Sequence, residues 1–439
     1  MTTVRDGIEA DLEGFDVPGA SWVVFDEGAV TEVGTAGVAE AGSGRAVTPA
    51  TLFQAASISK PVTVLAMLRL VDQGLLDLDE DVNRKLKSWQ VPPTGRWQPT
   101  VTLRQLASHS AGLTVSGFPG YPREATLPTT PQILDGTRPA TNIGVRGDLV
   151  PGTQFRYSGG GTTVIQQLLE DVTGSPFRDI MQELVLQPLG MSDSDYAQPL
   201  PPNLHANAAS GHNDLGQPLN GKWDVYPQLA AAGLWTTPTD LAKFAIGLER
   251  AYADAEGALL PPELARQMLT PQIAATERIG GLNHLGLGVF LDESGTRYGH
   301  SGGNKGFCCH LLAYRDTRQG AVVMTNGDSG MWVVLRAFAA IASSRGWPSY
   351  SQELEEPDLP TTESLERLTG THRLTNGVRL VVRVWDRGLG AQFEGQEPLE
   401  FRALSADRFA AAGVDAQLEV RGGELVFLQG GAEFGCVRE

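Results

Sequence analysis

The chain has 439 residues, of which 41% are hydrophobic, so it can form one large and one small globular domain. Its net charge of −17 disfavours binding to nucleic acid and to anionic membrane surfaces. No apolar run is long enough for a membrane span, and Met1–Glu9 lacks the apolar core of a signal peptide, so we expect a cytoplasmic protein.

The cysteine and histidine patterns suggest no metal or redox centre. Three cysteines are an odd number, which suits a reducing compartment better than a disulfide framework. None of them stands at a predicted helix start, so a catalytic cysteine is not expected. The seven histidines show no spacing typical of metal ligands. We therefore expect an activity that needs neither a metal nor another cofactor.

The first elements in the chain are two alternating stretches, residues 21–25 and 30–33, which predict a β-hairpin. An extended stretch then leads to Ser57, which opens a helix predicted over residues 62–73. The free N–H groups of a helix start favour developing negative charge, and Lys60 lies on the same helical face within reach of the Ser57 hydroxyl. A desolvated lysine has a lowered pKa and can accept the serine proton. Ser57 and Lys60 are therefore candidates for a nucleophile and its base, the alternative being an N-cap serine beside a solvated lysine.

The middle of the chain contains long irregular stretches and three candidate aromatic residues. Residues 114–149 are rich in Pro, Gly and Thr and predict a long loop at the border of a cleft. Tyr157 follows on a turn that enters a helix predicted over residues 164–172, where a tyrosine can relay a proton to a leaving group. We expect Tyr226 and Trp235 to line the substrate pocket, with aromatic packing as the alternative for each of the three.

A glycine-rich element, Gly299-His300-Ser301-Gly302-Gly303, comes next. Glycines on a strand edge let a substrate backbone approach closely, and they offer an N–H group to an oxyanion. Strands are predicted over residues 287–290, 306–310 and 320–326, and a helix over residues 332–343. Strands at both ends with helices between them predict an α+β fold in which one antiparallel sheet is flanked by helices and a helical subdomain.

A change of character near residue 350 predicts a second domain. Residues 1–350 form the first domain, and the acidic, proline-bearing residues 351–364 read as a linker. Residues 365–439 contain five short alternating stretches separated by glycine-containing turns, which predict a small all-β barrel. We expect no chemistry from this domain, and covering the cleft, mediating assembly into a homo-oligomer and stabilising the chain are its candidate roles.

The order of the motifs, Ser-x-x-Lys, then Tyr157, then the glycine-rich element, resembles that of the serine β-lactamases and penicillin-binding proteins. Further segments are similar to the class C β-lactamase-like serine hydrolases, a family that includes esterases, D-amino-acid peptidases and amidases: residues 103–113, 187–191 and 232–241. The resemblance runs from about residue 19 to about residue 340 and implies a β-lactamase/transpeptidase-like fold. Residues 365–439 resemble the lipocalin-like C-terminal domain of some relatives.

The resemblance also implies roles for individual residues. Ser57 would be the nucleophile, Lys60 its general base and Tyr157 a second acid/base. His300 would take the place of the lysine in the K-T-G element, with a catalytic role beside Tyr157. The backbone N–H groups of Ser57 and Gly303 would form the oxyanion hole.

Two positions depart from the family pattern. Gly159 stands where the family has an asparagine that hydrogen-bonds the lysine and the substrate amide. His300 replaces a lysine, which weakens the recognition of a carboxylate. Both positions, with Gly302, are expected to contact the substrate. The two changes favour the esterase and peptidase branch over efficient β-lactam turnover.

The predicted function is therefore that of a serine hydrolase that forms an acyl-enzyme with a small ester or amide, including D-amino-acid peptides. One alternative is a thioesterase of the penicillin-binding-protein type that cyclises or releases peptides from thioesters. Another is a non-catalytic ligand-binding protein on the same scaffold, which the missing asparagine at Gly159 supports.

Ser301 satisfies G-x-S-x-G, but a strand follows it where a nucleophile elbow needs a helix. Ser329, in Gly-Asp-Ser-Gly, reads as a plain turn.

Overall fold

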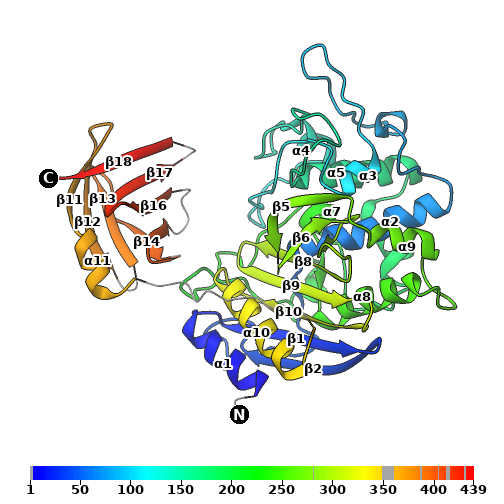
Figure 1. The fold of residues 1–439 in the computed structure, drawn as a ribbon, viewed down its shortest axis with the longest axis horizontal. Helices are drawn as coiled ribbons and strands as arrows, with labels where there is room; N and C mark the ends of the chain where they lie inside the picture. The colour runs from blue at the N-terminus through cyan, green and yellow to red at the C-terminus, as the bar shows by residue number, and fades with distance from the viewer. Residues whose placement is uncertain are drawn as a thin grey trace. The chain divides into compact units, whose positions relative to one another are not determined.

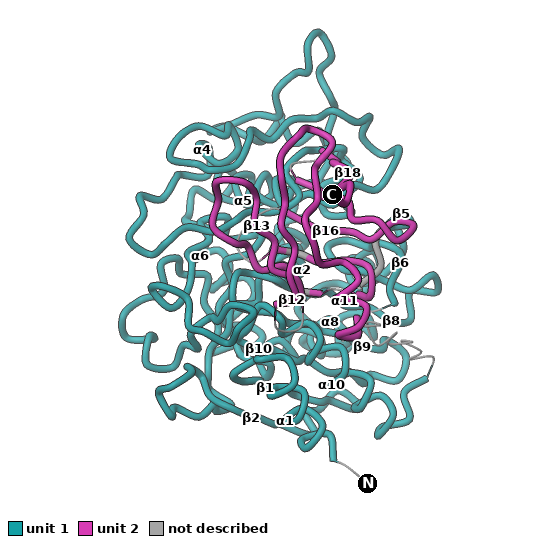
Figure 2. The backbone as a smooth tube through the Cα atoms, turned by 90° about the vertical axis from the view of Figure 1, so that its left-hand side faces the viewer, with its two compact units in different colours: residues 1–352 teal, residues 353–439 magenta. Residues whose placement is uncertain are grey.

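The protein divides into two compact units, residues 1–352 and residues 353–439 (Figure 2). The structure, a computed structural model, describes residues 3–279, 281–348, 360–385, 388–403, 405–411, 416–429 and 432–439. Most of the predicted linker, residues 351–359, lies outside this part. Its last residues belong to helix α11 (Thr362–Leu368), which begins where the Thr361 side chain accepts the Ser364 N–H group.

An antiparallel sheet of eight strands runs through the described part of the first unit in the order β2-β1-β10-β9-β8-β7-β6-β5. Its strands are β1 (Gly19–Asp26), β2 (Ala29–Gly37), β5 (Ile273–Ile279), β6 (Leu282–Leu285), β7 (Phe290–Leu291), β8 (Arg297–Asn304), β9 (Phe307–Tyr314) and β10 (Gln319–Thr325). The N-terminal hairpin joins the C-terminal strands through β1 and β10, with Ala20 opposite Thr325. Strands β3 (Phe53–Gln54) and β4 (Trp235–Thr236) form a separate short pair.

Helices lie against this sheet and form a helical region beside it (Figure 1). They are α1 (Val4–Gly14), α2 (Ser59–Asp72), α3 (Leu103–Ala107), α4 (Thr130–Asp135), α5 (Gly159–Thr173), α6 (Phe177–Met181), α7 (Leu229–Ala232), α8 (Pro238–Tyr252), α9 (Pro262–Met268) and α10 (Gly330–Arg345). Further short helical segments of other types are η1 (Ala56–Ile58), η2 (Val82–Arg84), η3 (Gln182–Leu186) and η4 (Pro202–Leu204). No helix within the described ranges combines the length and apolarity that a membrane crossing requires.

Strand β1 shows why the sheet carries helices on both faces. Trp22 and Val24 belong to one hydrophobic cluster, which also contains residues of α1 and α10. Val23 and Phe25, which point the opposite way, belong to a second cluster that contains residues of α2 and α8. The strand is thus buried on both faces, and the predicted α+β architecture is confirmed.

The sequence analysis missed several elements of the first unit. Strands β5 and β6 were not predicted, and the strand predicted over residues 287–290 is shorter and begins only at Phe290. The loop predicted over residues 114–149 contains α4, which a capping box at Thr129 and Gln132 starts.

The second unit is an antiparallel barrel that closes, in its described residues, through pairing of its first and last strands. The strands are β11 (Gly370–Leu374), β12 (Arg379–Trp385), β13 (Gly388–Phe393), β14 (Leu399–Ala403), β15 (Arg408–Ala411), β16 (Ala416–Arg421), β17 (Glu424–Gln429) and β18 (Ala432–Arg438). Apolar side chains such as Leu380, Phe401 and Leu418 fill its core, to which α11 adds Leu365 and Leu368. The predicted all-β barrel is confirmed, although β11, β15 and β18 were not among the predicted strands.

Candidate active site

Ser57 lies in η1, the turn that leads directly into α2. The residue before it, Ala56, has a φ of +47°, a left-handed conformation that residues with a Cβ rarely adopt. Hydrogen bonds hold the turn in this shape: the Ser59 hydroxyl donates to the Ala56 carbonyl at 2.6 Å and accepts the Leu234 N–H group at 3.0 Å. Ser57 itself is only half-buried, whereas the first residues of the helix that follows are buried.

Lys60 lies one turn further along, and its side chain points back to Ser57. Its Nζ atom lies 2.9 Å from the Ser57 Oγ atom and 2.8 Å from the Ala231 carbonyl oxygen. The side chain is buried, and this desolvation lowers the pKa of Lys60 to about 7. A substantial fraction of the amine is therefore neutral near pH 7 and able to accept a proton from Ser57.

Tyr157, which stands just before α5, has its ring next to the Lys60 side chain. Its ring centroid lies 5.0 Å from the Lys60 Nζ atom. The ring also packs against His109, with 4.3 Å between ring centroids, and against Phe290 and His300 at 6.3 Å and 6.1 Å. The structure thus brings Ser57, Lys60 and Tyr157 together, as the motif order predicted for one site.

His109 supports Tyr157 from the segment that follows α3. It has a φ of +53°, its Nδ1 atom accepts the Ser158 N–H group at 3.2 Å, and its carbonyl oxygen accepts the Arg156 N–H group at 2.8 Å. These two bonds hold the backbone on both sides of Tyr157. The pKa of His109 is well below its usual value, mainly because the side chain is buried and secondly because Lys60 is nearby. His109 is therefore a neutral packing partner for the Tyr157 ring.

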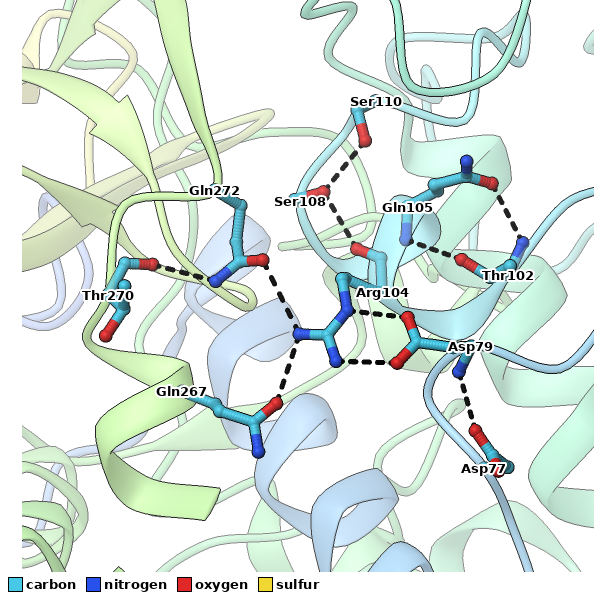
Figure 3. Close-up of polar contacts among 10 residues, drawn as sticks. All are labelled: Asp77, Asp79, Thr102, Arg104, Gln105, Ser108, Ser110, Gln267, Thr270 and Gln272. Carbon is cyan, nitrogen blue, oxygen red and sulfur yellow. Dashed lines mark hydrogen bonds and ion pairs between the residues drawn. The ribbon is translucent and has the colours of Figure 1, made fainter. Parts of the chain in front are cut away.

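A polar network fixes the segment that carries His109 (Figure 3). The Ser108 and Ser110 hydroxyl oxygens lie 2.9 Å apart, and Ser108 donates to the Arg104 carbonyl at 2.8 Å. The Arg104 guanidinium makes two hydrogen bonds with Asp79, of 2.7 Å and 2.8 Å, and a third, of 3.1 Å, with Gln267. The segment is thus tied both to the connection after α2 and to α9.

Strand β8 packs against η1, the turn that carries Ser57. Among the described residues, the β8 edge that faces β7 has no strand partner from His300 onward, because β7 pairs only with Tyr298 and Gly299. A Cβ atom at Gly302 would lie 2.3 Å from the Ala55 carbonyl oxygen, so only glycine allows this approach to the serine turn. A Cβ atom at Gly303 would meet nothing within 4 Å. Gly303 is exposed and borders open space, as a substrate-facing residue must.

His300 is neutral in this environment. Its side chain is buried, and burial first and the neighbouring Lys60 second lower the pKa of His300 to about 3. The Nδ1 atom lies 2.5 Å from the Ser301 carbonyl oxygen, which can only accept, so Nδ1 carries the hydrogen. The Nε2 atom is then an acceptor, and it is buried without a hydrogen-bond partner among the described residues.

Two predicted substrate-binding residues, Tyr226 and Trp235, are more deeply buried than we expected of a pocket lining. Tyr226 and Trp235 are 2% and 0% exposed, and the Tyr226 hydroxyl accepts the Lys305 N–H group at 3.1 Å. Trp235 packs edge-on against Trp223. We therefore correct the prediction that they contact the substrate: both are buried packing residues. At Gly159, the first residue of α5, a Cβ atom would lie only 3.1 Å from the Phe118 ring.

The hydroxyl groups of the two rival serines have other partners. Ser301 sits within β8, and its hydroxyl oxygen lies 2.8 Å from His310 Nδ1 on the neighbouring strand. Ser329 precedes α10 and donates to Asp214 at 3.2 Å. Within the residues that the structure describes, neither serine is hydrogen-bonded to Lys60. In the same ranges, no three His, Cys, Asp or Glu side chains cluster as metal ligands would.

A family model described as Beta-lactamase matches residues 4–345. Penicillin-binding protein 4 of Amycolatopsis lactamdurans is 26% identical over 382 residues, which cover 82% of this chain and 94% of that protein. Protein flp of Staphylococcus aureus (strain N315) is 25% identical over 330 residues, 73% of this chain but only 62% of the length of flp.

Solved structures share the fold at low identity. The octameric penicillin-binding protein homologue from Pyrococcus abyssi has a TM-score of 0.65 and 21% identity, and the match covers 98% of this chain and 99% of that chain. SurE has a TM-score of 0.62 and 24% identity, with 98% of both chains covered. D-amino acid amidase from Ochrobactrum anthropi SV3, complexed with L-phenylalanine amide, has a TM-score of 0.61 and 22% identity over 78% of this chain and 99% of that chain.

Proposed function

The chain belongs to the beta-lactamase family, and from this premise we propose that it is a serine hydrolase that acts on esters and amides through an acyl-enzyme at Ser57. One observation carries the proposal: a buried lysine with a pKa of about 7 hydrogen-bonds the Ser57 hydroxyl at 2.9 Å. A serine becomes nucleophilic when a neighbouring base can take its proton, and a desolvated lysine is such a base. The same contact argues against a purely ligand-binding protein, which needs no base at this place.

The proposed reaction has two acyl-transfer steps. Neutral Lys60 takes the Ser57 proton while Oγ attacks the substrate carbonyl, and the backbone N–H groups of Ser57 and Gly303 stabilise the oxyanion. Tyr157 then protonates the leaving group and regains a proton from Lys60, so the alcohol or amine departs and the acyl-enzyme remains. Water, deprotonated along the same route, attacks the acyl-enzyme and releases the acid and Ser57.

The charges at the site support substrates that are neutral next to the scissile bond. His300 is uncharged above about pH 3, and Lys60 loses its charge at about pH 7. A free carboxylate on the leaving group would therefore lack the fixed cation that a lysine at residue 300 would supply. We propose neutral esters and amides, including D-amino-acid amides, in preference to peptides with a free C-terminal carboxylate.

Hydrolysis of p-nitrophenyl acetate and butyrate by the wild type and Ser57→Ala tests this function. We expect the variant to lose nearly all activity, by a factor of about 10³ or more, whereas Ser301→Ala, the matched control, keeps it. Equal activity of wild type and Ser57→Ala would refute the proposal. A peptidyl thioester as a further substrate separates the finer alternatives, since release of an acid supports a hydrolase and a cyclic product supports a peptide-cyclising thioesterase.

Self-association is a separate proposal, supported only by likeness to a homologue whose structure is octameric. Light scattering on the purified protein, which gives the mass of the particle in solution, tests it. A mass equal to that of one chain, 46.9 kDa, would contradict it.

A further inference from the structure

The ring of Phe118 occupies the space next to Gly159 that a longer side chain would fill. A Cβ atom at Gly159 would lie 3.1 Å from Phe118 Cε2 and 3.0 Å from the Ser116 carbonyl oxygen. We propose that Phe118 is a specificity-determining residue whose ring contacts the acyl group of the substrate and favours extended apolar acyl groups. This inference rests on the proposed function, because it assigns a substrate class to the same site.

The segment that carries Phe118 is fixed to the start of α5. The Ser116 and Val115 carbonyl oxygens accept the Gly159 and Gly160 N–H groups at 3.0 Å and 2.9 Å. The Ser158 hydroxyl donates to the Thr114 carbonyl at 2.8 Å. Val115 has a φ of +67°, which a β-branched residue rarely adopts. The hydrogen bonds therefore stabilise a backbone conformation that is unfavourable for Val115 by itself.

The same segment reaches the far end of the site. A Cβ atom at Gly120 would lie 2.8 Å from Tyr226 Cζ, so the backbone of the segment lies against this ring. The Tyr226 hydroxyl in turn accepts the Lys305 N–H group at 3.1 Å. Lys305 follows Gly303 closely in the turn after β8. Phe118 therefore belongs to a segment that is hydrogen-bonded to the start of α5 and that reaches, through the Tyr226 ring, the turn after Gly303.

The proposed chemistry orients a substrate relative to this segment. Its carbonyl oxygen lies at the N–H groups of Ser57 and Gly303. Its leaving group must approach Tyr157, whose ring packs against Phe290 of β7 and against His300, which precedes Gly303 by three residues in β8. The acyl group then extends toward the Gly303 end, where the segment of Phe118 lies. Phe118 is half-buried, so part of its ring is free to contact an apolar acyl group.

The test is a series of p-nitrophenyl acetate, butyrate and octanoate with wild type, Phe118→Ala and Phe118→Leu. We expect Phe118→Ala to lower the ratio of kcat/KM for octanoate to that for acetate by about tenfold or more, with most of the change in KM. Phe118→Leu keeps apolar bulk and should retain most of the preference. Ile143→Ala, an apolar residue of the same long connection that is 72% exposed, is the control and should leave the ratio unchanged.

An unchanged ratio in Phe118→Ala, or a rise in octanoate turnover, would overturn the assignment. A second pair of variants asks whether the two positions share one space: Gly159→Asn should lower activity on all esters, and Phe118→Ala added to it should restore part of that loss. Additive losses would show that the ring does not occupy the place of a side chain at residue 159.

Failure of the proposed function has a different signature from failure of this inference. If wild-type hydrolysis depends on Ser57 and only the chain-length ratio is flat, Phe118 loses its role and the hydrolase stands. If no ester is hydrolysed in a Ser57-dependent manner, both fall together.

Discussion

The Nζ atom of Lys60 lies 2.9 Å from the Oγ atom of Ser57 although the lysine side chain is buried. A second hydrogen bond, to the Ala231 carbonyl at 2.8 Å, fixes the amine in this position. Burial thus does two things for the proposed reaction: it holds the base within reach of the nucleophile, and it lowers the pKa of the base toward neutrality.

The pH dependence of the reaction should report Lys60. Only the neutral amine accepts the serine proton, so kcat/KM for p-nitrophenyl acetate should rise with pH and level off above about 7. The pKa of His300, about 3, adds no further transition between pH 5 and 8. A midpoint above pH 9 would mean that Lys60 stays charged and that another group is the base.

Tyr157→Phe should separate proton relay from packing. The ring contacts with His109 and Phe290 remain in this variant, so the protein should still fold, as circular dichroism can check. Hydrolysis of an alkyl ester or an amide, whose leaving group needs a proton, should fall by about 10²-fold or more. The loss with p-nitrophenyl acetate should be much smaller, because p-nitrophenolate leaves without protonation. Equal losses on both substrates would contradict the relay.

Neighbouring glycines of β8 offer a matched pair of variants. Gly302→Ala places a methyl group 2.3 Å from the Ala55 carbonyl oxygen and should cost about 1–3 kcal/mol of unfolding free energy and most of the activity. Gly303→Ala meets nothing within 4 Å and keeps its N–H group, so it should unfold like the wild type. Urea denaturation and acetate hydrolysis of both variants check this. Equal destabilisation would show that β8 does not press against the serine turn.

The parts of the site that the sequence predicted depend on local geometry. Ser57 and Lys60 are three residues apart at a helix start, and this spacing alone brings them together. The stretch at residues 21–25 likewise identified β1, although the strand is buried on both faces rather than on alternate residues.

The parts that could not be predicted depend on contacts between distant segments. His109 supports Tyr157, and Phe118 lies against Gly159, only because loops far apart in the chain fold onto the start of α5. The burial of Trp235 has the same origin, since it depends on its contact with Trp223, which the local sequence does not reveal. In the barrel, β15 has only four residues, too few for a clear alternation.

The most direct test of the account is to find where a fluorophosphonate probe attaches. Intact-protein and peptide mass spectrometry of the labelled wild type should place one probe on Ser57, with parallel loss of esterase activity, and Ser57→Ala should remain unlabelled. A probe on Ser301 or Ser329, or full activity in an unlabelled protein, would contradict the assignment of Ser57 as the nucleophile.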